Sequence, residues 1–403
     1  MSLRMIWLVQ FAVAGILSAG LPLDALPPSG CPNSPKAAQF LEDLKHEMTI
    51  NQTAIEKEVA SGDVSTYYFT SYYLMGLAEG AEANGDPEAM AHLVGLIDHM
   101  LASAKPVRRN NRTYNEFMPL GSDGLPQQLD AFQATAPLAR TAAIIRTRPE
   151  FKVKFAAAAD RIVRFVDESV FQFWFDKTTG VYADPKGHWQ GGSIPWLPKD
   201  LGGWGSYSSW VDKASHLGAI STWMWQATGD RRYLEFAQRI AEGFHRHVTV
   251  VDGCWIWDKG TVQIEAGQNL HGTPDTSHAN REPLMVVAMY EAGIEFTLAD
   301  VQAIATTLVR KIWNQDPSNP MFANYIDGNN ALYRNAGPWT NGLLYAGWSA
   351  VGRYSTVAEG ILETVYGSIR TPQALSTNPS LRSNGSSYGH VAFPGVLARN
   401  RAR

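Results

Sequence analysis

The chain has 403 residues and a formal net charge of -4, so it can bury a large core but carries no general basic field for nucleic acid. Its 13 Trp, 15 Tyr and 16 Phe suit stacking against sugar rings as well as packing in a helical core. We expect no nucleic-acid partner and no membrane partner.

Residues 1–25 have the pattern of a secretory signal peptide: a basic start, a short apolar run and then small residues. The run is shorter than the ~20 apolar residues that span a bilayer, and no later stretch qualifies. We therefore predict a secreted protein, extracellular or periplasmic, with one domain over 26–403. Its two cysteines, Cys31 and Cys254, can form one disulfide in an oxidising compartment.

Apolar residues recur three and four positions apart along the chain, which indicates helix almost throughout. Five helix pairs follow one another, most of them joined by a short turn in which Gly ends one helix and Asp or Thr caps the next. A first helix over Ala37–Met48 can contribute to a sixth pair. The predicted pairs are Thr66–Ala83 with Glu88–Ala104, Leu129–Thr147 with Phe155–Phe173, Lys213–Ala227 with Arg232–His247, His278–Ala292 with Leu298–Trp313, and Thr340–Val351 with Thr356–Arg370.

A helical hairpin with one apolar face must pack against neighbours, and several hairpins can close into a ring. We predict an all-α fold, an (α/α)n toroid with n of about 6 to 7. Long connections then share one rim, where function concentrates. Residues 371–403, rich in Ser, Asn, Pro and Gly, are expected to form an irregular tail. The long connections cover 105–128, 174–212, 248–277 and 314–339.

The strongest functional signal begins the fourth helix pair. Asp275 is expected to cap a helix whose first turn holds His278, with Asn280 and Arg281 beside it. Imidazole and amide groups placed together can hold a carboxylate or move a proton. This cluster is therefore a candidate active site at the functional rim.

Similar polar and aromatic residues lie in the other long connections and at the helix starts that follow them. Tyr325 and Tyr333 lie one hairpin later, and a tyrosine beside a cation such as Arg334 can act as acid or base. Motifs for phosphate, dinucleotide or zinc binding are absent from the sequence, so we expect no cofactor and no metal. The remaining candidates are Gln128, Trp204, Trp210, Lys213, His216, Glu282 and Trp339.

Two motifs give the chain a family resemblance. Pro274–Asn280 opens a helix, and Phe322–Gly328 follows one hairpin later. With the signal sequence and the helix pairs, these motifs resemble secreted α/α-toroid polysaccharide lyases of the alginate and glucuronan lyase type, polysaccharide lyase family 38. The resemblance implies β-elimination on a 4-linked uronic-acid polymer, with a carboxylate-neutralising group and a tyrosine that transfers protons.

The resemblance assigns roles to the candidate residues. His278 neutralises the carboxylate or abstracts a proton, and Tyr333, or else Tyr325, transfers protons. The partner is then an anionic polysaccharide, and the protein is expected to be a monomer. A contiguous Asn-Asn-His run known from other alginate-type toroid lyases is missing here. The residues assigned to substrate binding are Asn280, Arg281, Glu282 and Arg334 for the uronate, Trp204, Trp210 and Trp339 for stacking, and Gln128, Lys213 and His216 for further contacts.

Two other functions fit the same pattern. A glycoside hydrolase on this fold needs two carboxylates flanking the bond, although no adjacent Asp-Asp pair occurs. A non-catalytic carbohydrate-binding protein would keep the Trp-rich rim and tolerate loss of His278 and Tyr333. Candidate hydrolase carboxylates are Glu116, Asp212, Asp275, Glu282 and Asp327.

Overall fold

The computed structural model of the protein describes most of the chain from residue 35 onward. Predictions that fall on other residues, including the signal sequence and Cys31, lie outside it. Cys254 is buried in a short strand. The described residues are 35–109, 111–118, 128–175, 211–257, 272–318, 320–330, 346–369 and 392–402.

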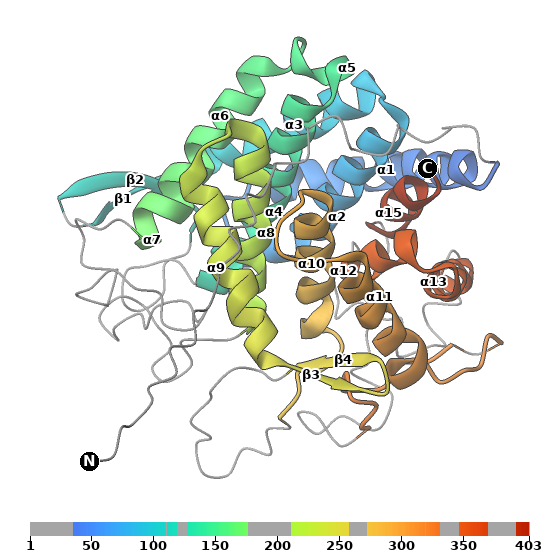
Figure 1. The fold of residues 1–403 in the computed structure, drawn as a ribbon. Coiled ribbons are helices and arrows are strands. Elements are labelled where there is room, and N and C mark those ends of the chain that lie inside the picture. The colour runs from blue at the N-terminus through green and yellow to red at the C-terminus, as the bar shows by residue number, and fades with distance from the viewer. Residues whose placement is uncertain are drawn as a thin grey trace, which may run out of the picture.

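Six helices form a closed inner ring, in which each contacts the next and the last contacts the first (Figure 1). In chain order they are α2 (Val64–Asn84), α4 (Gln128–Thr147), α8 (Val211–Thr228), α10 (Arg281–Glu291), α12 (Ala346–Ser349) and α15 (Ala392–Arg401).

A second helix packs on the outside of each inner helix or, for α12, on the short helix η7 that continues it. The outer helices are α3 (Pro87–Ser103), α6 (Ala156–Val166), α9 (Arg231–His247), α11 (Leu298–Thr307), α13 (Thr356–Ile369) and α1 (Pro35–Val59). Shorter helical segments extend or join them: α5 (Pro149–Lys152), η2 (Asp167–Gln172), α7 (Phe173–Phe175), η5 (His278–Asn280), η6 (Leu308–Ile312) and η7 (Ala350–Tyr354). The five predicted helix pairs are confirmed wherever the structure describes them.

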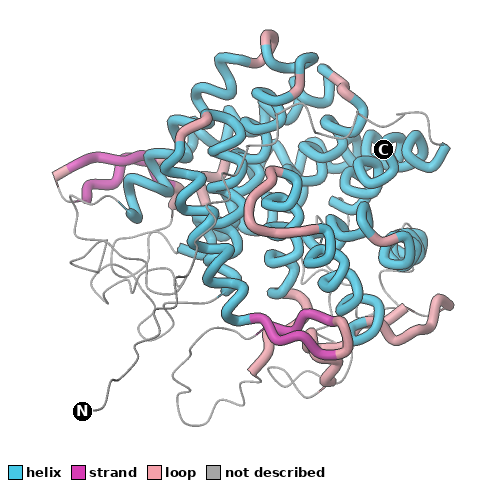
Figure 2. Tube along the Cα trace, in the orientation of Figure 1, coloured by secondary structure: helices cyan, strands magenta, loops and turns pink. Residues whose placement is uncertain are grey.

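Two antiparallel hairpins lie in the long connections, at the edge of the helical body (Figure 2). The first joins β1 (Lys105–Arg109) to β2 (Arg112–Glu116), and the second joins β3 (Val248–Val251) to β4 (Cys254–Trp257). No helix in the described part of the chain is both long and apolar enough to cross a membrane.

The prediction of an irregular C-terminal tail is wrong for Ala392–Arg401, which forms α15 and packs against α1 and α2. Pro394 and Gly395 favoured a loop in the sequence. Proline is tolerated in the first turn of a helix, however, and the glycine is needed by the packing. The sixth pair therefore consists of the last helix and the first, α15 with α1.

The closing contact between α15 and α2 depends on glycine. A Cβ atom built on Gly395 would lie 1.9 Å from the carbonyl oxygen of Gly76, and one built on Gly80 would lie 3.6 Å from the Cα atom of Gly395. The two helix backbones thus approach more closely than any larger residue allows. This contact completes the inner ring.

A buried ion network joins the same helices. Arg399 of α15 donates to Glu82 of α2 (2.6 Å) and to Glu291 of α10 (2.5 Å). Arg140 of α4 donates to Glu79 (2.7 Å) and Glu82 (2.5 Å). Burial acts to raise the pKa of Glu82, but the guanidinium charges of Arg140 and Arg399 outweigh it and lower that pKa to about 2.

We predict that Gly395→Ala lowers the free energy of unfolding by about 1–3 kcal/mol or more, because the added methyl group forces α15 away from α2. Gly95→Ala in α3 is the matched control, since a Cβ there meets nothing within 4 Å. Alanine should stabilise that helix by up to about 1 kcal/mol. Urea denaturation of both variants measures the difference, and equal stability of the two would contradict the close contact.

Glu82→Gln is expected to lower the free energy of unfolding by about 3 kcal/mol at neutral pH, because two buried guanidinium groups lose a charged partner. Folding lowers this pKa, so the stabilisation is present above the unfolded value near 4.5 and disappears as the pH falls towards 2. Denaturation curves of the variant and the wild type should therefore converge over that pH range. A gap that stays constant with pH would exclude this explanation.

Candidate functional site

The first turns of four inner helices meet at one rim, around the buried side chain of Arg281, which is only 2% exposed. Its Nε donates to Oε1 of Gln133 in α4 (3.2 Å) and to Nε2 of His216 in α8 (2.6 Å). Its two terminal nitrogens donate to the backbone carbonyl of His278 (3.1 Å) and to the hydroxyl of Tyr68 in α2. One guanidinium group thereby contacts side chains that lie 65 to 213 positions away from Arg281 in the sequence.

His216 is neutral in this cluster. Burial lowers its pKa well below the usual value, and the adjacent charge of Arg281 lowers it further. A neutral imidazole accepts through one nitrogen, which here is Nε2 facing Arg281. His216 therefore holds Arg281 in place from below the rim, rather than meeting substrate directly as the sequence suggested.

His278 is oriented by Asp275. Its Nδ1 lies 2.7 Å from Oδ2 of this carboxylate, and its backbone N–H donates to Oδ1 (3.2 Å). Burial acts to raise the pKa of Asp275, but His278 and the hydrogen bonds from His278 and Ser277 reverse the effect and lower that pKa. The His278 side chain is 31% exposed, so an ionised carboxylate fixes an imidazole that solvent can reach.

The two motifs of the family resemblance lie side by side. Thr276 N–H donates to the carbonyl of Asn324 (2.9 Å), and Ile326 N–H donates to that of Pro274 (3.3 Å). The indole of Trp348 in α12 donates to the Thr276 carbonyl (3.0 Å) from behind. These bonds fix the start of the His278 turn against the 322–328 segment.

Tyr325 pairs with Asp275 through the backbone in this contact, but its side chain is buried, with 1% exposure. Burial raises the pKa of its phenol, and the carboxylates of Asp275 and Asp327 raise it further. A phenol that resists ionisation is a poor general base. Tyr325 supports the site rather than reaching into it.

Asn280 and Glu282 are also buried. The Asn280 amide donates to the Ser277 carbonyl (2.7 Å), and Glu282 accepts from the hydroxyl of Ser215 (3.1 Å). Lys213, by contrast, is half-buried in the first turn of α8. Gln128 begins α4 at the same rim. The predicted residues Trp204, Trp210, Tyr333, Arg334 and Trp339 lie outside the described ranges.

Sequence reasoning missed Tyr68, Gln133 and Asp130. All three lie in the first two turns of α2 and α4, which are the same kind of position as the residues that were singled out in α8 and α10. Applying the helix-start criterion to the first pair would have found Tyr68. The partnership with Arg281 could not be read from the chain, because it joins residues far apart.

Asp130 has an unusual ionisation. Burial raises its pKa to about 6, Arg281 and Lys213 act to lower it, and the carboxylate of Asp63 raises it. Two acidic and two basic side chains from four inner helices therefore influence one another at this rim. A carboxyl group with such a pKa can hold or release a proton near neutral pH.

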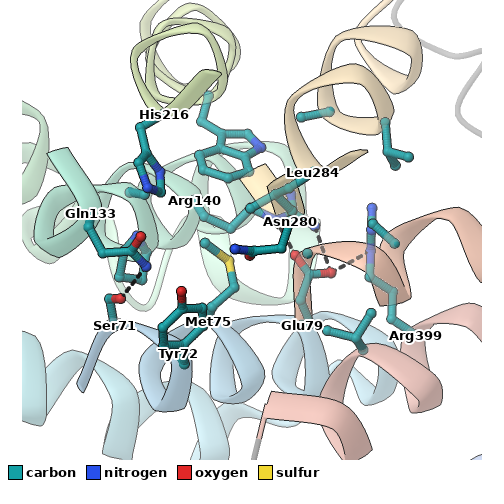
Figure 3. A pocket seen from close by; sticks show the side chains of 18 of the residues that line it. Ser71, Tyr72, Met75, Glu79, Gln133, Arg140, His216, Asn280, Leu284 and Arg399 are labelled. Atoms are coloured by element: carbon teal, nitrogen blue, oxygen red, sulfur yellow. Dashed lines mark hydrogen bonds and ion pairs between the residues drawn. The ribbon is translucent and has the colours of Figure 1, made fainter. Parts of the chain in front are cut away.

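A small cavity lies below the rim, lined by all six inner helices (Figure 3). Its volume is about 40 Å³, room for roughly three waters and too little for a sugar ring. Gln133 and His216 line one side of it, at the left in Figure 3, and Glu79, Arg140 and Arg399 belong to the ion network. A ligand the size of a sugar ring therefore does not fit within this cavity.

The carboxylates predicted for a hydrolase are mostly engaged elsewhere. Asp275 binds His278, Glu282 binds Ser215, and Glu116 is buried in β2. Asp327 accepts from the backbone of Asn329 in a turn (3.0 Å). The side chain of Asp212 lies outside the part of the chain that the structure describes. Within the described ranges, no group of three or more His, Cys, Asp or Glu is placed to hold a metal ion.

The architecture matches solved carbohydrate-active proteins. A polysaccharide lyase is 13% identical, with 91% of this chain and 97% of that chain covered and a TM-score of 0.53. A glycosyl hydrolase family 88 protein from Bacteroides vulgatus is 14% identical, with 91% and 99% covered and a TM-score of 0.53. An α-1,6-mannanase, GH76A, from Salegentibacter sp. HEL1_6 is 12% identical, with 91% and 99% covered and a TM-score of 0.45.

No protein-family model matches the chain, and no curated protein matches it. At such low identity the likeness defines the fold alone, and the predicted fold is confirmed: the protein is an α/α toroid.

We predict that Asp130→Asn increases the free energy of unfolding by on the order of 1–2 kcal/mol at pH 8. The folded pKa lies above the unfolded value of 3.8, so wild-type stability declines as the pH rises from about 4 to about 6 and stays lower beyond. Asparagine removes this decline in stability, because it has no charge to bury. Melting temperatures of both proteins across pH 4–8 measure the difference, and parallel plots of melting temperature against pH would refute the expectation.

Proposed function

We propose that the protein is a secreted polysaccharide lyase that cleaves a 4-linked uronic-acid polymer, glucuronan or alginate, by β-elimination. The observation that carries this proposal is the link that Arg281 makes between the Tyr68 hydroxyl and the backbone of His278, whose imidazole is held by Asp275. The fold shared with a solved polysaccharide lyase and the resemblance to family 38 give further support.

The reaction needs a base for the proton on C5 of the uronate. His278 takes this role through Nε2, the ring nitrogen on the opposite edge from Asp275. The carboxylate keeps Nδ1 protonated and stabilises the imidazolium that forms when the proton arrives. His278 does not have to be reoriented during the reaction, because its hydrogen bond to Asp275 is already formed in the folded protein.

The uronate carboxylate must also be neutralised, because its negative charge opposes removal of the C5 proton. The ammonium group of Lys213 and the hydroxyl of Tyr68 serve this purpose. Arg281 donates to the Tyr68 oxygen, which leaves the phenol proton to point at the substrate. A donor aimed at developing negative charge is worth about 3 kcal/mol.

We assign Arg281 and Asn280 roles that differ from those implied by the resemblance. Arg281 is buried and acts on the carboxylate through Tyr68, and Asn280 supports the His278 turn. The contacts assigned to residues of the long connections remain proposals from the sequence. They are proton transfer by Tyr333 and substrate binding by Trp204, Trp210, Arg334 and Trp339.

A glycoside hydrolase is the second candidate, favoured by one observation. Asp63 and Asp130 begin neighbouring inner helices, and the charge of Asp63 raises the pKa of Asp130. A glycoside hydrolase needs two carboxyl groups on either side of the scissile bond, and this pair could supply them. A hydrolase would release reducing ends without forming a double bond.

The purified protein should release products with a new C4–C5 double bond, seen as ultraviolet absorbance, from glucuronan or alginate and not from neutral polysaccharides. His278→Ala should lower kcat by about 10³-fold or more, and Tyr68→Phe by about 10²–10³-fold. Tyr354→Phe is the matched control, since it removes a phenol bonded to the charged Glu291 at a distance from the rim. Reducing ends without absorbance would favour the hydrolase, and binding that survives both rim substitutions without turnover would favour a non-catalytic protein.

A further inference from the structure

The rim site is built in two layers. Three adjacent inner helices each place two polar side chains three residues apart, which puts them on one helix face about one turn from each other. The deeper residue of each pair belongs to the Arg281 cluster. The pairs, with the residue nearer the rim first, are Asp130 and Gln133 in α4, Lys213 and His216 in α8, and His278 and Arg281 in η5 and α10.

The exposed fractions of these side chains differ between the two layers. Gln133, His216 and Arg281 are at most 5% exposed, and they bond one another. The three residues one turn nearer the rim are all half-buried. Because the lower layer is tied together, the upper residues are brought over the same point. They form the surface that a bound sugar meets.

The order of the helices sets the order of these side chains. Helix α8 contacts both α4 and α10, so Lys213 belongs to the helix that lies between the helix of Asp130 and the helix that the His278 turn begins. A uronate held by Lys213 therefore has His278 on one side and a carboxyl group on the other. An elimination needs this division of labour, because one group takes the C5 proton while another serves the leaving oxygen.

We infer that Asp130 is the general acid of the site, the group that protonates the glycosidic oxygen as it leaves C4. This assignment rests on the proposed lyase function, and in it Asp130 replaces Tyr333 as the group that gives a proton to the leaving oxygen. As the C5–H bond breaks, His278 takes the proton and the electron pair becomes the C4–C5 double bond. The C4–O4 bond breaks, and the carboxyl proton of Asp130 passes to O4, which departs as a hydroxyl. Exchange with water then reprotonates Asp130 and deprotonates His278.

The charges around Asp130 suit this role. Arg281 and Lys213 face it with positive charge and Asp63 with negative charge, while burial keeps part of the population protonated near neutral pH. An acid works best when its pKa lies near the operating pH. When the substrate carboxylate binds to Lys213, it adds a further negative charge that favours the protonated form of Asp130.

The test separates leaving groups. One substrate is the polymer, and the other is a methyl hexuronoside carrying 4-nitrophenoxide at C4, which leaves without a proton. Asp130→Asn should lower kcat on the polymer by about 10²–10⁴-fold and on the aryl substrate by less than about 10-fold. Asp130→Glu should restore part of the polymer activity. Asp98→Asn, in an ion pair on outer helix α3, should change neither rate.

Melting curves of each variant establish that it folds. Equal losses on both substrates, or a change confined to KM, would overturn the role of Asp130 while leaving the lyase in place. If the wild type forms no double bond from either substrate, the proposed function fails and the acid assignment fails with it.

Discussion

A ring of helix pairs has to close on itself, and here closure depends on the contact between the last inner helix and the first. Gly395 lets the backbone of α15 touch that of α2 at Gly76, and Arg399 carries the buried ion network from α2 to α10. Burying guanidinium groups is costly unless each has a carboxylate partner. The network therefore constrains which helices can lie together, while the glycine contact sets how closely they approach.

Closure has a direct consequence for the rim. Once the inner helices are held in a ring with their first residues on one side, side chains from the first turns must converge. Arg281 occupies the point of convergence and bonds Tyr68, Gln133 and His216. These three acceptors are neutral, so they hold the guanidinium without cancelling its charge. Its positive field then acts on the half-buried residues above it, where an anionic sugar would bind.

In the proposed function, the same arrangement lets a small set of residues divide the roles of acid, base and anion binding. Asp275 keeps His278 as a proton acceptor, whereas burial keeps Asp130 partly protonated. An oriented imidazole and a carboxyl group that can carry a proton thus lie at the starts of the two inner helices that flank α8. The α/α-toroid frame is shared with a solved polysaccharide lyase and a solved glycosyl hydrolase, so the frame alone does not define the chemistry.

The helix pairs, the toroid and the His278 turn were determined by the sequence itself, because apolar spacing, glycine turns and capping residues are local signals. The irregular tail was mispredicted, since Gly395 is required only by a contact more than 300 residues away along the chain. Tertiary structure alone decided that Tyr325 is buried, that His216 is a neutral acceptor, and that Arg281 lies beneath Tyr68. These properties depend on which side chains come into contact across the ring. Such contacts cannot be predicted from the spacing of residues along the chain.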